Sequence, residues 1–309
     1  MKWSCSCWAT TQQEADSFLQ QIQLKEFTSG ITQTWTLQAP RGPWSVDGIE
    51  SSLKLTLPPT INVDVKNRFG NVTIAGSDAT IKLINMYGDI TAKNLSGKCE
   101  LENSFGAINV EEVGECRIKN NQGNTTVSDV TGMLDATNSF GQLNVAGVEG
   151  AVMLENNKGN ITAENIAGKA TIKTGFATLR VDGVTGDVNL TNSNGRIFAE
   201  NLMGSTARIV NSFGPIEIET SATSVECTNQ NGKIEVELTN PELLNATLST
   251  KFNDLLVHLP STMVPNLKLD AGAGKITSEF EGGLAGSAAP VVEATTENGN
   301  VIVKRIPTE

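Results

Sequence analysis

Residues 85–106 read NMYGDITAKNLSGKCELENSFG, and an asparagine followed three residues later by a glycine recurs along most of the chain. The glycines of this pattern are Gly70, Gly88, Gly106, Gly123, Gly141, Gly159, Gly195, Gly214 and Gly232. Ala177 occupies the one missing place, so successive steps are 17 to 19 residues long. A period this constant predicts a solenoid, in which each repeat buries its apolar side chains only against its neighbours.

The repeat that begins at Gly88 predicts two short strands. Apolar residues alternate with polar ones on either side of a break at Asn94, and an alternation of period two is typical of a strand with one buried face. The residues expected to face inward lie 2, 4, 7, 11 and 13 positions after the glycine, and are Ile90, Ala92, Leu95, Cys99 and Leu101. We therefore expect an all-β chain folded as a single-stranded parallel β-helix.

The asparagine of the pattern is the second constant feature. It occurs at Asn67, Asn85, Asn103, Asn120, Asn138, Asn156, Asn192, Asn211 and Asn229, with Thr174 in the gap. It follows the last inward aliphatic residue by two positions, so it too should face the interior or a corner. Because a buried amide must be hydrogen-bonded, we expect these side chains to form a structural ladder that bonds to itself and to the turn backbone.

The residue before the glycine alternates between phenylalanine and a polar residue. Phe105, Phe140 and Phe176 alternate with Gln122 and Lys158, which gives a superperiod near 36. Either each coil contains 18 residues and bulky and polar corners alternate, or each coil contains 36 and like residues stack on like. The sequence slightly favours 18.

The regular repeat divides the chain into three segments: an N-terminal tail and cap at 1–52, regular solenoid repeats at 53–240, and irregular C-terminal coils with a cap of the same solenoid at 241–309. Residues 1–9 are expected to form a tail. Thr11 and Glu14 have the spacing of a capping box, which predicts an amphipathic helix at about 12–25. All four tryptophans lie in the first 44 residues, and we expect them to form an apolar cap over the first coil.

Composition excludes several classes of protein. The formal net charge of −11 argues against a nucleic-acid partner, because phosphate binding requires clustered lysine and arginine.

Cys99 and Cys116 fall in the same inward position of consecutive repeats and are interpreted as small buried apolar residues, although a bridge between them is sterically possible. We expect no signal peptide and no transmembrane segment, because no apolar run is long enough for either.

The residues of known catalytic sites do not converge in this sequence. The single histidine, His258, is expected at the surface, which argues against triad chemistry and histidine-rich metal sites. A β-helix enzyme that cleaves glycans would need clustered carboxylates. The outward acids are expected to be spread along the axis, and are Asp89, Glu111, Glu112, Asp129, Glu164, Asp182, Asp187, Glu217 and Glu235. We expect no catalytic residues, no metal and no cofactor.

The alternation of Asn-Ser-Phe-Gly (103–106, 138–141, 211–214) with Asn-Asn/Gln-x-Gly (120–123, 156–159, 229–232) resembles the bacterial adhesin-like β-strand-repeat domain of unknown function, also called the Toastrack type. The ending at 295–303 resembles it as well, and the likeness covers about residues 53–306. The resemblance implies a right-handed β-helix, usually in the cell envelope, and it implies no catalytic residues.

These observations favour a non-enzymatic interaction or structural module, adhesin-like and associated with the bacterial cell envelope. Its partner would be a protein, peptide or glycan, because the outward positions are rich in threonine, asparagine and acidic residues. The alternatives are a self-assembling structural scaffold and, with less support, a carbohydrate-active β-helix enzyme.

Overall fold

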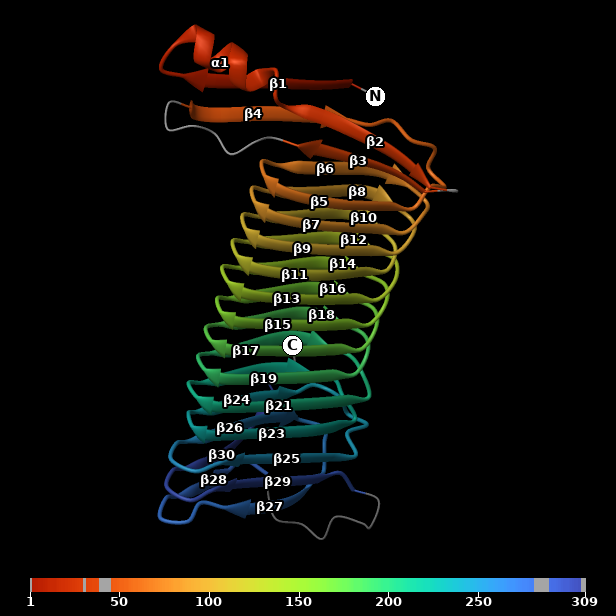
Figure 1. The fold of residues 1–309 in the computed structure, drawn as a ribbon. Helices are drawn as coiled ribbons and strands as arrows, with labels where there is room; N and C mark the ends of the chain where they lie inside the picture. Colours follow the sequence, from red (N-terminus) through yellow and green to blue (C-terminus); the bar gives the residue numbers. More distant parts are fainter. Residues whose placement is uncertain (1, 30–31, 39–45, 281–288, 307–309) are drawn as a thin grey trace. The chain divides into compact units, whose positions relative to one another are not determined.

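The computed structural model describes residues 2–29, 32–38, 46–280 and 289–306. The chain divides into two compact units, Met1–Pro58 and Pro59–Glu309. The second unit is a parallel β-solenoid built from two sheets of 13 strands each (Figure 1). Its first strand begins at Val63, whereas the sequence placed the start of the repeats at residue 53.

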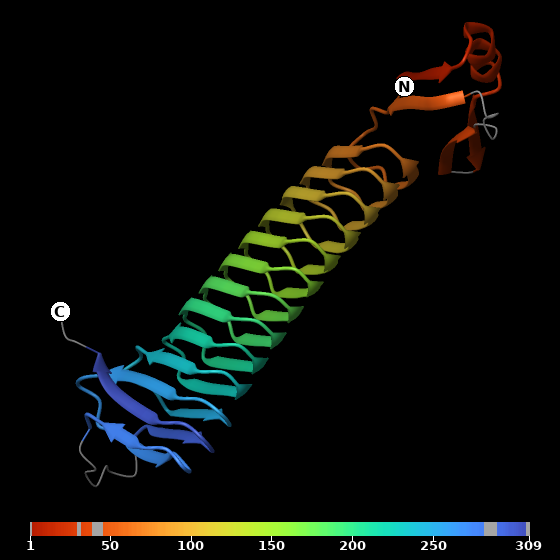
Figure 2. The same ribbon diagram turned by 90° about the vertical axis from the view of Figure 1, so that its left-hand side faces the viewer.

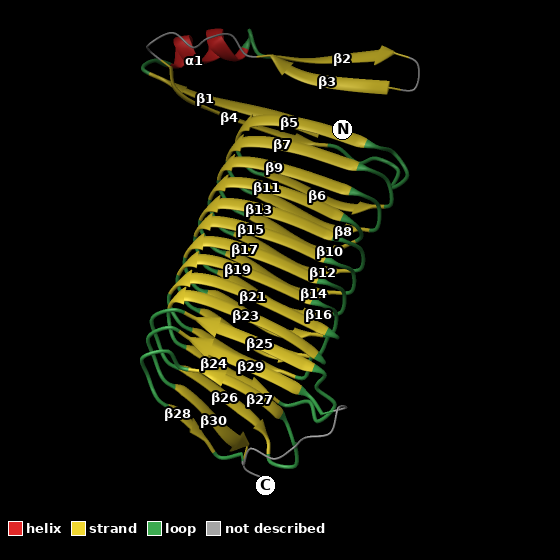
Figure 3. Cartoon of the chain, turned by 90° about the horizontal axis from the view of Figure 1, so that it is seen from below, coloured by secondary structure: helices red, strands yellow, loops and turns green. Residues whose placement is uncertain are grey.

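One sheet, here the odd-strand sheet, contains in spatial order β5 (Val63–Phe69), β7 (Ile81–Tyr87), β9 (Cys99–Phe105), β11 (Cys116–Gln122), β13 (Leu134–Phe140), β15 (Val152–Lys158), β17 (Ala170–Phe176), β19 (Val188–Asn194), β21 (Thr206–Phe213), β23 (Ser224–Asn231), β25 (Asn245–Thr250), β29 (Val291–Thr296) and β27 (Asn266–Asp270). The other, the even-strand sheet, contains β6 (Val72–Ser77), β8 (Ile90–Leu95), β10 (Ile108–Val113), β12 (Thr125–Val130), β14 (Leu143–Val148), β16 (Ile161–Ile166), β18 (Leu179–Val184), β20 (Ile197–Leu202), β22 (Ile216–Thr220), β24 (Ile234–Leu238), β26 (Leu255–Pro260), β30 (Val301–Ile306) and β28 (Ile276–Ser278). Short turns join the two sheets at their edges (Figure 3).

The strand register shows that each coil contains about 18 residues. Asn103 lies opposite Asn85 on one side and Asn120 on the other. Bulky and polar corners therefore alternate along the axis, as Phe105, Gln122 and Phe140 do. The slight preference for 18 over 36 residues per coil is confirmed.

The inward positions predicted from the repeat form the core. The five inward residues of the coil that follows Gly88 are at most 2% exposed, and their equivalents in the other coils join them in one apolar cluster. Cys99 and Cys116 lie opposite each other, and both are buried free thiols, as the interpretation of small apolar residues predicts.

The constant glycine has a steric cause. Gly106 has φ +134, a conformation that L side chains rarely adopt, and a Cβ on it would lie 2.2 Å from the carbonyl oxygen of Gly88 in the preceding coil. The same close approach recurs from coil to coil, as at Gly141 above Gly123. The backbone turns thus stack so closely that a side chain has no room.

The C-terminal end of the solenoid is not stacked in chain order. Strands β29 and β30 come last in the sequence, yet they lie between β25–β26 and β27–β28. The outermost described coil is therefore β27–β28, which comes earlier in the sequence (Figure 2). The irregular terminal coils expected beyond residue 240 are present, but their spatial order could not be read from the repeat.

The first unit differs from the expected tail and cap. It contains β1 (Lys2–Ala9), α1 (Gln12–Leu19), β2 (Gln23–Ser29), β3 (Thr32–Gln38) and β4 (Val46–Lys54). Strand β1 pairs antiparallel with β4, and β2 pairs antiparallel with β3. Residues 2–9 are thus a strand and not a tail, because they form a ladder with β4.

The predicted helix is confirmed at its start and is wrong at its end. Thr11 and Glu14 form the expected capping box, but the helix stops at Leu19 and the chain enters β2 at Gln23. The tryptophan-rich helical cap is not supported, because the described part of this unit contains four strands and a single helix of eight residues. Trp44 lies outside the described residues.

Candidate functional site

One corner of the even-strand sheet is built from residues with left-handed (αL) backbone. In each of eight consecutive coils, the second-to-last residue of the even strand has φ between 52 and 70. These residues, here called the αL corner, are Gly76, Asn94, Glu112, Asp129, Gly147, Asn165, Gly183 and Asn201. The left-handed residue reverses the alternation, which is why Leu95 and its equivalents point into the core seven positions after the glycine.

Most side chains at the αL corner suit its backbone. Glycine adopts the αL conformation without a steric cost, and asparagine and aspartate adopt it more often than other L residues do. Glu112 is the exception, with φ 54. The sequence signal for this corner was the break in alternation at Asn94, but the break did not reveal that the conformation repeats in eight consecutive coils.

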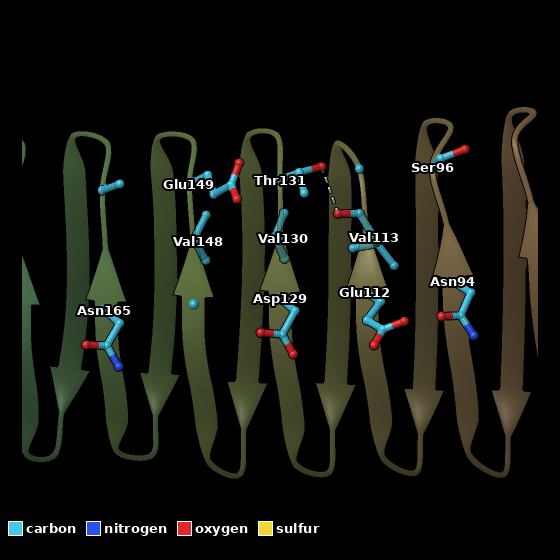
Figure 4. A pocket seen from close by; sticks show the side chains of 13 residues that line it. Asn94, Ser96, Glu112, Val113, Asp129, Val130, Thr131, Val148, Glu149 and Asn165 are labelled. Atoms are coloured by element: carbon cyan, nitrogen blue, oxygen red, sulfur yellow. Dashed lines mark hydrogen bonds between the residues drawn. The ribbon is translucent and has the colours of Figure 1, made fainter.

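A shallow groove of about 610 Å³ runs along the αL corner across β8 to β16. Figure 4 shows two rows of side chains beside it, with Asn94, Glu112, Asp129 and Asn165 in one and residues of the following turns in the other. The turn row includes Ser96, Thr131 and Glu149.

The groove is acidic. Glu112, Asp129 and Glu149 line it, and no lysine or arginine does. All three residues are exposed, and the structure shows no side-chain hydrogen bond or ion pair from them to any described residue. These carboxylates are therefore available to a cationic partner.

A second set of acids lies on the outward face of the even-strand sheet, directly before the αL residue in β16, β18 and β20 and on β22 and β24 beyond them. The fourth residue of five consecutive even strands is acidic, and this acidic column consists of Glu164, Asp182, Glu200, Glu219 and Glu237. In the strand register, Glu164 lies opposite Asp182, Asp182 opposite Glu200, and Glu219 opposite Glu237. Carboxylates directly opposite one another on neighbouring strands repel.

Burial and the neighbouring acids of the column both act on Glu219. Partial burial and the neighbouring charges of Glu237, Glu200 and Asp182, in that order, raise the pKa of Glu219 above its ordinary value of 4.5. Two members of the column have polar partners, since Asn201 Nδ2 donates to Asp182 Oδ1 at 2.7 Å and Arg180 lies 3.6 Å from Glu200. The repulsion is thus only partly offset within the chain.

The structure changes the interpretation of the outward acids. We expected them to be spread along the axis, but Glu164 and Asp182 belong to one column. Sequence reasoning missed Glu200, Glu219 and Glu237. Their signal was the same 18- to 19-residue spacing as that of the glycines, at a different offset.

The asparagines of the proposed ladder lie in one in-register column. Their side-chain amides donate mainly to the carbonyl oxygen of the glycine in the preceding coil, as Asn156 Nδ2 does to Gly141 at 2.8 Å. Among the described residues, a direct amide-to-amide bond joins one pair, Asn67 Nδ2 to Asn85 Oδ1 at 3.1 Å. Thr174, in the gap, reaches the equivalent carbonyl only at 3.5 Å. The column therefore fastens each side chain to the backbone of the coil before it.

Aromatic residues form a second exposed corner on the odd-strand sheet. The rings of Phe69, Tyr87 and Phe105 stack with centroids 5.2 and 5.0 Å apart, and Arg68 lies 5.2 Å from the Phe69 centroid. Because the faces of the Tyr87 ring are covered by its neighbours, this corner offers ring edges and not a stacking platform. We assign it to packing between coils.

The remaining predicted positions take no part in the groove. His258 lies 3.8 Å from Glu235 on the even-strand sheet with its side chain 24% exposed, and so is more buried than the surface position that we expected. The described residues hold no group of three or more histidine, cysteine, aspartate or glutamate side chains placed to bind a metal. None of the described helical residues forms a segment long and apolar enough to span a bilayer.

Comparison of the chain with protein-family models, with curated proteins and with solved structures gave no match. The groove and the acidic column are therefore interpreted from their own geometry.

Proposed function

We propose that the solenoid is a non-enzymatic interaction module that binds an extended, positively charged partner, such as a lysine- and arginine-rich peptide segment, along its αL corner. The observation that carries this proposal is the run of carboxylates at this corner and directly beside it: Glu112, Asp129 and Glu149 in the groove, followed by the acidic column. A partner with positive charges at matching intervals would relieve their mutual repulsion.

The dimensions suit an extended chain. The acidic column crosses five neighbouring strands, which lie about 4.8 Å apart, so it is about 19 Å long. An extended peptide advances about 3.3 Å per residue, so about six residues would span the column. The groove across β8 to β16 offers a similar length at the adjoining αL corner.

The proposal can be tested with a labelled peptide of alternating lysine and serine and the full chain. We expect binding that weakens as ionic strength rises, because exposed charges are screened by salt. Replacing Glu219 and Glu237 by glutamine should weaken binding by up to about tenfold.

A matched control removes two carboxylates from the other sheet. Glu100→Gln with Glu102→Gln makes the same charge change on β9, and it should leave binding near the original level. Equal losses in the two double variants would show that only net charge matters, and would contradict a site at the αL corner.

The cellular setting is part of the same proposal. An adhesin-like protein of the bacterial cell envelope is what the sequence resemblance implies, and an acidic binding corner fits a partner with basic segments at the cell surface. External protease should cut the protein on intact cells while a cytoplasmic control protein survives. If the protein stays intact until lysis, although protease cuts the purified sample, surface exposure is excluded.

A carbohydrate-active enzyme is the second candidate, and the groove gives it one specific observation. Glu112 and Asp129 occupy the same position of neighbouring coils, and both line the groove, as a pair of carboxylates lines the cleft of most glycosidases. Release of reducing sugar from polysaccharides, lost in Glu112→Gln and in Asp129→Asn, would favour the enzyme over the binding module.

A further inference from the structure

The two ends of the solenoid each present a coil that pairs on one side only in the described part of the chain. Strands β5 and β6 are the first of their sheets, and β27 and β28 are the last. Their inward residues are incompletely covered: Val63 and Val65 at one end and Leu267 and Leu269 at the other are partly buried, whereas Ile81 and Leu83, one coil further in, are 0% exposed. Within the described part of the solenoid, both ends thus leave apolar core residues only partly covered.

The end coils have matching geometry. Inward Ile276 of β28 follows inward Leu267 of β27 by nine positions, and inward Val72 of β6 follows Val63 of β5 by the same number. A second copy that places β5 on β27 would therefore also bring β6 onto β28. Both sheets could continue from one copy into the next.

The charges of the two end strands are complementary in this register. Leu267 lies opposite inward Val292 of β29, so the next strand in the stack would place Val63 opposite Leu267. The outward residues then pair Lys268 with Asp64 and Asp270 with Lys66. None of these four side chains forms an ion pair with another described residue.

The same kind of pair joins neighbouring coils inside the solenoid. Arg117 lies opposite Asp135 on the next strand, with Nε 3.3 Å from Oδ2, at the outward position that corresponds to Asp64. Arg208 likewise contacts Glu226 on the next strand. An end-to-end contact would repeat an arrangement that the fold already uses.

Other parallel registers are disfavoured by the same charges. A slip of two residues keeps the apolar residues inward, since side chains alternate with period two. One such slip places Lys268 opposite Lys66, although it also places Asp270 opposite Arg68, and it puts apolar Leu269 opposite polar Asn67. The opposite slip places Asp270 opposite Asp64. Like charges directly opposite are destabilising, so the register with two opposite-charge pairs is favoured over either slip.

We propose that this protein assembles head to tail, with the β27–β28 coil of one copy pairing in parallel with the β5–β6 coil of a second copy. The contact joins two different surfaces, so it repeats at every end and builds a filament unless the rotation between copies closes a ring. The proposal is independent of the acidic corner.

Charge reversal on the full chain tests the contact. Sedimentation velocity over a concentration series should show oligomers beyond dimer for the unaltered chain. Lys268→Glu and Asp64→Lys should each raise the concentration needed for association by about tenfold or more, because each places like charges at the contact. Lys169→Glu, a reversal at an exposed turn lysine within the solenoid, should leave association unchanged.

Combining the two charge reversals shows whether a single variant fails to assemble because the contact is broken or because the chain is unfolded. The double variant Lys268→Glu/Asp64→Lys restores opposite charges and should assemble again, and so should an equimolar mixture of the two single variants. Circular dichroism and the thermal midpoint should show that each single variant is folded. A chain that stays monomeric at its solubility limit, a species that stops at dimer, or folded single variants that are not rescued would each overturn the proposal.

Discussion

The side-chain nitrogen of Asn138 lies 3.1 Å from the carbonyl oxygen of Gly123 in the preceding coil and donates a hydrogen bond to it. The same nitrogen also approaches the carbonyl oxygen of Gln142, at 3.4 Å. The asparagine column therefore joins each coil to its neighbour through the glycine turn. The glycine permits the close approach, and the asparagine satisfies the buried carbonyl that this approach creates.

Replacing Asn138 by leucine should lower the free energy of unfolding by about 1–3 kcal/mol, because buried carbonyl groups lose their donor. Chemical denaturation measures the change. Thr174→Asn is the matched control, since it installs the amide where the column lacks one, and it should leave stability unchanged or raise it. An unchanged denaturation midpoint in Asn138→Leu would contradict a structural role for the column.

Gly141→Ala should destabilise the solenoid by about 1–3 kcal/mol. Gly141 has φ +115, and a Cβ there would lie 2.3 Å from the carbonyl oxygen of Gly123, so the turn must move. Ala177 occupies the equivalent place in another coil without a positive φ. The control Ala177→Gly should therefore change stability by no more than about 1 kcal/mol. Similar losses in the two variants would argue against the steric explanation.

Glu112→Asn should raise the free energy of unfolding by about 1 kcal/mol, because asparagine tolerates the αL conformation better than glutamate does. The chain itself places asparagine at this position in Asn94, Asn165 and Asn201. Glu102→Asn, at an outward strand position without a positive φ, is the control and should be neutral or destabilising. If Glu112→Asn were less stable than the original chain, Glu112 would have a stabilising contact that outweighs its strain.

The stability of the protein should depend on the charge of Glu219. The pKa of this group is higher in the folded state than its ordinary value of 4.5, so the folded state binds the proton more tightly than the unfolded state. The ionised Glu219 carboxylate thus lowers the free energy of unfolding at neutral pH, and this loss is relieved as the pH falls through the raised pKa. Glu219→Gln should be more stable than the original chain at neutral pH, and the difference should disappear on acidification.

Thermal midpoints measured between neutral pH and pH values near the ordinary carboxyl range would show this convergence. Glu242→Gln, the same substitution at an exposed position in a turn away from the column, serves as the control. A constant difference for Glu219→Gln would mean that neither burial nor the neighbouring acids raise the pKa of Glu219.

The regular part of the fold could be predicted from the sequence because each coil repeats the same pattern of turn residues and inward apolar residues. Gly106 and Asn103 mark the turn, and the spacing of Ile90, Ala92 and Leu95 determines which side chains face inward. Each of these inferences depends on neighbours about 18 residues away, and the period itself supplies that information. The 18-residue coil follows for the same reason.

The ends of the chain could not be predicted in the same way. Strand β29 enters its sheet between β25 and β27, and β30 enters the other between β26 and β28; no periodicity encodes that order. Residues 2–9 pair with β4 across a long interval, so the ladder is not visible in the local sequence. Helix α1 stops at Leu19, although the amphipathic spacing extends to Ile22, because the residues from Gln23 onward pair with β3 as strand β2.

The candidate site could be predicted only in part. The acids were recognised as outward residues, but the left-handed corner and the bulge between β20 and β22 determine which of them become neighbours. Glu164, Asp182 and Glu200 share one offset from the repeat glycine, and that offset was the signal available in the sequence. The raised pKa of Glu219 depends on burial as well as spacing, and so required the structure.

The most direct test of the proposed binding corner is carbodiimide cross-linking of the full chain to the lysine–serine peptide, followed by peptide mapping. This chemistry joins an amine to a carboxylate only where the two are in contact. The account predicts links at Glu112, Asp129 and Glu149 and along the acidic column, and few at Glu100 and Glu102 on the odd-strand sheet. Links distributed over both sheets in proportion to exposure, or concentrated on the odd-strand sheet, would contradict it.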